Sequence, residues 1–66
     1  MRITITDIRA AGHCVAGARG WFRTYDLDFR DFLKNGIDAE VLLATGDALA
    51  EQVVERKIER ESNGQG

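Results

Sequence analysis

The stretch "TYDLDFRDFLKNGIDAE", residues 24–40, places an acidic residue before an apolar run, a glycine after it, and then a second acidic residue. An aspartate at an N-cap accepts a hydrogen bond from a backbone N–H of the first helical turn. A glycine past the last turn adopts the left-handed conformation without steric cost. Asp28 and Gly36 therefore predict a short helix between them, and Ile37 leads directly into Asp38, which predicts the start of the next helix. We interpret these aspartates and the glycine as helix ends rather than as a binding motif.

The same pattern opens the chain. Thr4 is predicted as an N-cap to which Asp7 reaches back, and Ile3 and Ile8 have the spacing of a hydrophobic staple. A short first helix is expected to end near Gly12. The alternative for "RITIT" is a β-strand, because its residues alternate and include β-branched types. The staple spacing favours the helix cap.

Residues 13–26 predict an amphipathic second helix. Its larger and apolar side chains recur at helical spacing and form one broad stripe: Cys14, Val15, Ala18, Trp21, Phe22 and Tyr25. Gly17 and Gly20 lie inside this helix, where each costs up to about 1 kcal/mol relative to alanine. We interpret them as sites of close helix packing or of a local irregularity, with close approach to a ligand backbone as the alternative.

The last helix is expected to begin after "ATGD", with Thr45 or Asp47 as its N-cap. Ala50, Val54 and Ile58 then share one face of this helix, and its outer side is charged. The sequence shows no internal linker and no second domain.

The chain is predicted to be all-α: one helical domain over residues 1–61, a compact bundle of four or five short helices, followed by a flexible C-terminal tail, residues 62–66. At 66 residues, a single core contributes roughly 3–5 kcal/mol of net stability, so a deep catalytic cleft is not expected. The core is predicted from the inward-facing apolar positions, which are Ile5, Ile8, Val15, Ala18, Phe22, Leu27, Phe32, Leu33, Ile37, Leu42, Leu49, Val53 and Val54.

The composition indicates a folded chain, because 44% apolar residues supply enough surface to offset chain entropy. The lone cysteine, Cys14, makes no internal disulfide, and the single histidine does not complete a structural zinc site. Both observations fit a reducing cytoplasm. The residues after Met1 contain no apolar run as long as a signal peptide or a membrane span, so no membrane partner is expected.

The residues with reactive side chains do not form a catalytic set. His13 and Cys14 are adjacent, and on a helix they point about 100° apart, so they cannot ligate one metal or act as a base and thiolate pair. We expect a small buried thiol beside a partly exposed imidazole. The glycines between Gly17 and Gly20 are not followed by the lysine and hydroxyl of a phosphate loop. No catalytic residue, cofactor or metal site is predicted, and the chain is not expected to be an enzyme.

A protein-docking module is the preferred class of function. Trp21, Arg23 and Tyr25 are the candidate anchors, because large aromatic side chains and arginine dominate interface energetics. Phe22 is expected to belong to the core instead. The partner is expected to be another protein, with a homodimer as one arrangement.

The alternative is a small helix-turn-helix protein that presents basic side chains to DNA phosphates. The residues that would make these contacts are Arg19, Arg23, Arg30 and Lys34. Residues 1–36 hold six basic and four acidic side chains, whereas residues 37–66 hold three basic and seven acidic ones. The resulting net charge of -2 is far from the basic footprint of most nucleic-acid binders, and it favours docking.

Three segments, "DIRAAGHC", "LDFRDFLKNGI" and "ATGDALA", are similar to those of an uncharacterised family of small proteins encoded by tailed bacteriophages and prophages. The resemblance extends from about Ile3 to Val54. It implies a phage context, in which the partner is a phage or host protein and the chain acts as a virion assembly accessory or a modulator of a host protein. It implies a location in the host cytoplasm or in the virion. No functional residues carry over from this family.

Overall fold

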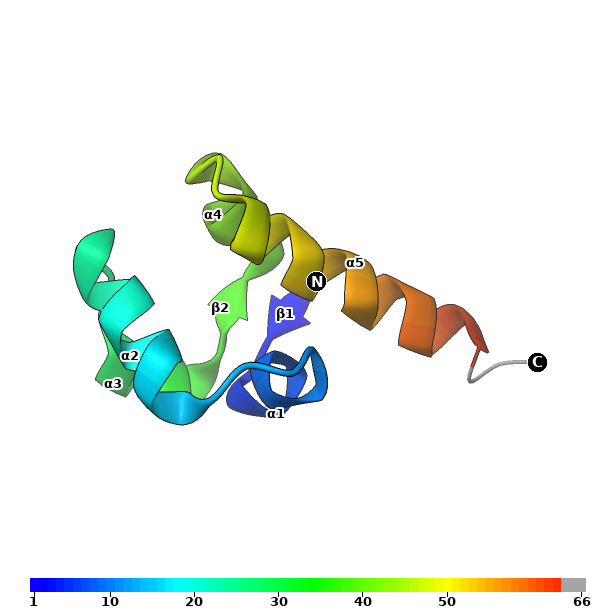
Figure 1. The fold of residues 1–66 in the computed structure, drawn as a ribbon, viewed down its shortest axis with the longest axis horizontal. Coiled ribbons are helices and arrows are strands. Elements are labelled where there is room, and N and C mark those ends of the chain that lie inside the picture. The colour runs from blue at the N-terminus through cyan, green and yellow to red at the C-terminus, as the bar shows by residue number, and fades with distance from the viewer. Residues whose placement is uncertain (64–66) are drawn as a thin grey trace.

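The computed structural model describes residues 1–63, and in that range it contains five helices and one short two-stranded ribbon (Figure 1). The elements in chain order are β1 (Arg2–Ile3), α1 (Ile5–Ala10), α2 (Val15–Thr24), α3 (Phe29–Asn35), β2 (Ile37–Asp38), α4 (Ala39–Ala44) and α5 (Ala48–Asn63). The predicted all-α domain of four or five short helices is therefore confirmed. Of the predicted tail, residues 64–66 lie outside the described residues, and α5 continues to Asn63.

The helices are arranged around the β ribbon. Figure 1 shows β1 and β2 near the centre, α2 and α3 together at one end, and α5 running from α4 toward the opposite end. The molecule is elongated, with extents of 37, 22 and 19 Å. Helices α2 and α3 thus lie at one end, whereas α5 extends toward the other.

The alternative prediction for the first residues, a β-strand, is present only as the short strand β1 of this ribbon. Arg2 pairs with Asp38 and Ile3 pairs with Ile37 in antiparallel register. The strand stops at Ile3 because Thr4 turns the backbone into α1: its N–H donates to the Asp7 carboxylate over 2.8 Å. The predicted cap and the competing strand are both present, one directly after the other.

Gly36 allows the ribbon to form. Its φ is +75°, the left-handed region that glycine adopts without strain, as the sequence predicts. Tertiary packing also requires glycine here, because a Cβ at this position would lie 2.9 Å from the carbonyl oxygen of Ile3. Glycine is therefore required both by the end of α3 and by the close approach of β1.

The other predicted caps are present as hydrogen bonds. Asp28 accepts from the N–H of Asp31 over 3.0 Å, and Asp38 accepts from the N–H of Glu40 over 3.1 Å. At the start of α5 the cap is Asp47, one of the two predicted candidates, whose Oδ1 accepts an N–H from the first turn of that helix. Local side-chain chemistry thus positions the starts of α3, α4 and α5.

The centre of the core is aromatic. Phe22 and Phe32 are each 1% exposed, and their ring centroids lie 4.6 Å apart. Phe29 packs edge-on against Phe22 at 5.3 Å. The buried apolar residues around this cluster come from every helix and from β1: Ile3, Ile8, Ala18, Phe22, Phe32, Ala39, Leu42, Ala50, Val53 and Val54.

Three predicted core residues are exposed instead: Val15 by 39%, Leu33 by 47% and Leu49 by 48%. Val15 and Leu49 lie in the first turns of α2 and α5, where Ala18 and Ala50 take the buried positions and these two side chains point outward. Leu33 follows Phe32, and successive helical residues point about 100° apart, so burial of Phe32 turns Leu33 outward. The core also holds Ile3, which was expected only as half of a staple.

A buried carboxylate holds α5 against the N-terminal elements. Asp7 is 7% exposed, and it accepts hydrogen bonds from Lys57 Nζ at 3.0 Å and from Arg60 Nη2 at 2.6 Å. Lys57 also donates to the carbonyl oxygen of Arg2. Burial raises the pKa of Asp7, but the hydrogen bonds from Thr4 and Lys57 outweigh it and hold the pKa below its usual value. The carboxylate is therefore ionised and paired at neutral pH.

Candidate binding pocket

A pocket of about 380 Å³ opens between the N-terminal helices and the start of α5. No Asp, Glu, Lys or Arg residue lines the pocket. Its volume lies in the range of small-ligand pockets, roughly 300–1,000 Å³. The residues that line it come from α1, α2, α4, α5 and the α1–α2 loop: Ile8, Gly12, His13, Cys14, Gly17, Ala18, Trp21, Phe22, Leu42, Leu49, Ala50 and Val53.

The start of α2 forms one edge of the pocket. Cys14 is the N-cap of this helix, and its Sγ accepts the N–H of Gly17 over 3.2 Å. The expected buried thiol is therefore wrong: Cys14 is exposed, because an N-cap lies outside the helix and its side chain turns back over the first turn. Gly17 keeps the adjacent wall open, since any side chain there would fill the space beside Cys14.

The far wall belongs to α5. Ala50 and Val53 are buried at 4% and 5% exposure, whereas Leu49 stands at the mouth with about half of its surface in solvent. Because the Leu49 side chain is large and apolar, it adds to the apolar surface that a binding partner would cover. The mouth is therefore apolar as well as the interior.

Two side-chain nitrogen atoms in the pocket residues are buried without a hydrogen-bond partner among the described residues: Nε2 of His13 and Nε1 of Trp21. The Trp21 indole also contributes to lowering the pKa of Asp47.

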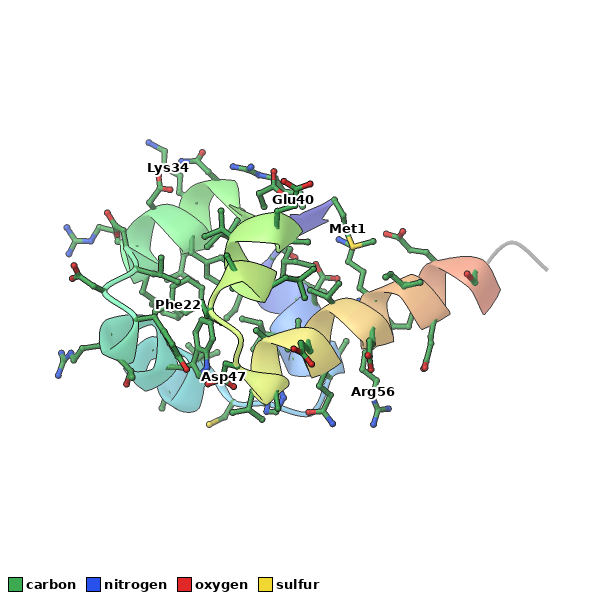
Figure 2. The ribbon with its side chains drawn as sticks, turned by 90° about the horizontal axis from the view of Figure 1, so that it is seen from above. Met1, Phe22, Lys34, Glu40, Asp47 and Arg56 are labelled. Atoms are coloured by element: carbon green, nitrogen blue, oxygen red, sulfur yellow. The ribbon has the colours of Figure 1, made fainter. Side chains whose placement is uncertain are left out.

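Tyr25 and Asp47 join the end of α2 to the start of α5. The Tyr25 hydroxyl donates to Asp47 Oδ2 over 2.6 Å, and the Trp21 and Tyr25 ring centroids are 4.6 Å apart. This hydrogen bond raises the pKa of Tyr25 and lowers the pKa of Asp47. Figure 2 labels Phe22 and Asp47 in this region, where the two helices approach one another.

The three predicted anchors do not form one surface. Trp21 and Tyr25 are separated by four residues and share a face of α2, whereas Arg23 between them points away from both. Trp21 lines the pocket, and Tyr25 is engaged with Asp47. Arg23 lies instead in a second groove between α2 and α3.

This second groove has a volume of about 610 Å³ and brings together three of the four predicted phosphate contacts. Lys34 is not among its lining residues. The groove also contains two carboxylates and an apolar floor. Its lining consists of Arg19, Arg23, Asp26, Leu27, Asp28, Phe29, Arg30 and Leu33.

The sequence pattern did not indicate the pocket. Helical spacing correctly placed Ala18, Trp21 and Phe22 on one face, but it could not show that the start of α5 leaves an open pocket beside them. Leu49 was assigned to the core for the same reason. Of the wall residues, Gly17 had the clearest signal, because a glycine in the middle of a helix lowers its stability and needs a compensating reason.

Within residues 1–63, no three side chains of His, Cys, Asp or Glu are arranged to hold a metal ion. None of the helices in this range has the length and apolar character to cross a membrane. The chain matches no protein-family model, no curated protein and no solved structure. The function is therefore argued from the geometry of these two concave surfaces.

Proposed function

We propose that this chain is a non-catalytic protein-binding module that docks a phage or host protein through the pocket between α2 and α5. The observation that carries the proposal is the pocket itself: an open apolar hollow of about 380 Å³ with an exposed leucine at its mouth. An apolar side chain of the partner would occupy it, because burial of such a group contributes about 1.5–3 kcal/mol to binding and no charged wall residue opposes its entry. The proposed setting is the host cytoplasm or the virion.

The composition of the pocket argues for binding rather than catalysis. Its polar side-chain groups are the imidazole of His13, the thiol of Cys14 and the indole N–H of Trp21, and the Cys14 sulfur accepts a hydrogen bond from the N–H of Gly17. The carboxylate at the start of α5, Asp47, is engaged by Tyr25. A catalytic site needs a nucleophile and a base in mutual hydrogen-bond reach, and the described pocket residues supply no such pair.

Two glycines of α2 provide a matched test of the pocket. Gly17 lines it, whereas a Cβ at Gly20 meets no atom within 4 Å. Gly17→Leu should therefore fill the pocket, and Gly20→Leu should add the same side chain to the same helix outside it. Both changes replace a poor helix former with a good one, so both proteins are expected to fold.

The experiment is affinity capture with the tagged wild type and both variants, from infected and uninfected host cells, with and without nuclease treatment. The proposal expects a protein that is recovered by the wild type and by Gly20→Leu but is lost with Gly17→Leu. Equal recovery with both variants would remove the pocket from the proposal. Recovery of nucleic acid alone, in samples without nuclease, would favour the alternative function.

That alternative is a DNA-binding protein, and one observation favours it: Arg19, Arg23 and Arg30 line a single groove. Phosphate contacts make affinity fall steeply with salt, by a slope of about -0.9 per contact in a double-logarithmic plot. Three contacts should therefore give a slope of about -3 for duplex DNA. A slope near zero, or no binding at low salt, would count against this function.

A further inference from the structure

The groove between α2 and α3 has the character of a docking site for an acidic helix. We call the three arginines Arg19, Arg23 and Arg30, with the floor of Phe29 and Leu33, the basic groove. All three arginines are exposed, and the guanidinium of Arg19 lies 5.9 Å from the ring centre of Phe29. Leu33 is 47% exposed, so the floor offers apolar surface beside the charges.

The complementary surface lies on α5 of the same chain. Glu51, Glu55 and Glu59 follow one another at intervals of four residues and are all exposed, which places them in one row along the helix. We call this row the acidic stripe. Ile58 adjoins it and is 47% exposed. The stripe therefore pairs negative charges with an apolar side chain, as the basic groove pairs positive charges with Leu33.

The spacing of the charges matches. Arg19 and Arg23 are four residues apart on α2, and so are Glu51 and Glu55 on α5, which gives about 6 Å between neighbouring side chains in both rows. The ion pairs among the described residues involve Asp7, Lys57, Arg60 and Glu61, and none of these belongs to either row. Like charges four residues apart destabilise an isolated helix, and an oppositely charged partner relieves that repulsion.

We propose that a second copy of the chain docks the acidic stripe of its α5 in the basic groove. The two surfaces lie on different elements, with α2 and α3 at one end of the molecule and α5 extending toward the other (Figure 1). Two antiparallel copies satisfy both surfaces as a two-fold dimer, and copies joined by one contact each repeat head-to-tail as an open chain. The contact between the two surfaces is the same in both arrangements. It is separate from the pocket and does not depend on the proposed function.

The composition of the groove favours an acidic helix over nucleic acid. Asp26 and Asp28 also line the groove, and their carboxylates reduce its attraction for a phosphate backbone and for a glutamate row alike, so the apolar floor makes the distinction. The floor of Phe29 and Leu33 has no counterpart on a phosphate backbone, whereas Ile58 of a second copy supplies one. Ion pairs between exposed side chains contribute little each, so a weak and transient contact is expected.

Sedimentation velocity over a concentration series tests the proposal. The wild type is expected to sediment as species that grow with concentration at low salt and revert to the monomer at high salt, because exposed charge pairs are screened. Arg19→Glu/Arg23→Glu and Glu51→Arg/Glu55→Arg should each weaken the association roughly 10-fold, through lost attraction and added repulsion.

Mixing the two reversed variants is the decisive measurement. Each variant alone carries two surfaces of the same sign, whereas the mixture again offers opposite signs across every contact, so association should return. Arg9→Glu/Arg56→Glu is the control, because it changes net charge as much as the arginine reversal does but lies outside both surfaces. Circular dichroism confirms that each variant is helical before it is compared.

Three results would overturn the proposal. The first is a wild type that stays monomeric at every concentration at low salt. The second is association that survives both reversals or that is weakened equally by the control. The third is a mixture that fails to associate although both variants are folded. Binding of duplex DNA that is lost with Arg19→Glu/Arg23→Glu, without self-association, would assign the basic groove to phosphates instead.

Discussion

The two ends of this molecule are held by different forces. At the α2–α3 end, Phe22 and Phe32 are almost fully buried, and their tilted rings pack with centroids 4.6 Å apart. At the α5 end, a buried carboxylate on α1 holds Lys57 and Arg60 at 3.0 and 2.6 Å. Apolar packing is insensitive to pH and to moderate salt, whereas a paired carboxylate depends on both. The α5 end therefore depends on a buried ion pair that the aromatic cluster lacks.

Phe22→Ala should have the largest effect, because it removes the side chain at the centre of the aromatic cluster. Truncation of a buried phenylalanine costs about 3–5 kcal/mol, which is comparable with the whole net stability expected of so small a domain. The expected result is loss of the helical circular dichroism signal at 25 °C. A folded variant with a small shift in its denaturation midpoint would show that the two ends are stabilised independently.

Asp7→Ala should come next, at about 2–4 kcal/mol, since it removes a helix cap and leaves Lys57 partly buried without its counterion. Hydrogen exchange is the informative measurement. Loss of protection should be greatest in the second half of α5 and smaller in α3. Equal loss in both helices would mean that the ion pairs support the whole core.

The same carboxylate predicts the direction of the pH dependence. Its pKa is lowered in the folded state from the ordinary 3.8, so the stabilisation is fully present above the unfolded value. It is lost as the pH falls through the folded one. Acid should therefore destabilise the wild type more than Asp7→Asn, measured by urea denaturation from pH 6 downward. Identical pH profiles would exclude Asp7 as the titrating group.

Gly36→Val should destabilise the domain by about 2–3 kcal/mol, because a β-branched residue is strongly disfavoured at a φ of +75° and its Cβ would overlap the Ile3 carbonyl at 2.9 Å. Gly36 lies at the β ribbon, between the two ends of the molecule, so this substitution acts there. Urea denaturation measures it, and Gly36→Ala should be milder, since alanine lacks the β-branch. An unchanged midpoint for valine would contradict the observed conformation.

Gly20→Ala should give the smallest effect and the opposite sign. A Cβ at Gly20 meets nothing within 4 Å, so the domain should gain about 0.5–1 kcal/mol from the lower entropy of its unfolded chain. Gly17→Ala should gain less, because its Cβ would lie 3.2 Å from Cys14 Sγ. Thermal denaturation of the pair measures the difference, and equal gains would show that Cys14 moves aside freely.

Much of the fold was predictable because helix ends are local. Asp28, Asp38 and Asp47 each bond to an N–H within three residues, so a short window of sequence contains the whole interaction. Burial was predictable where the helical spacing was long enough to define a face, as for Ala18 and Phe22 on α2. It was not predictable for Val15 and Leu49 in first turns, because the angle between two helices decides whether an end residue is covered.

By itself, the sequence determined where the helices start and stop, through caps and glycines that act over three or four residues. It also determined the separation of charge between the two halves of the chain. The tertiary structure alone decided that Asp7 meets Lys57 and Arg60, that Gly36 must admit the backbone of Ile3, and that an open pocket separates α2 from α5. These contacts join residues tens of positions apart. Their geometry depends on how all the helices pack at once, which the periodicity within any one helix does not encode.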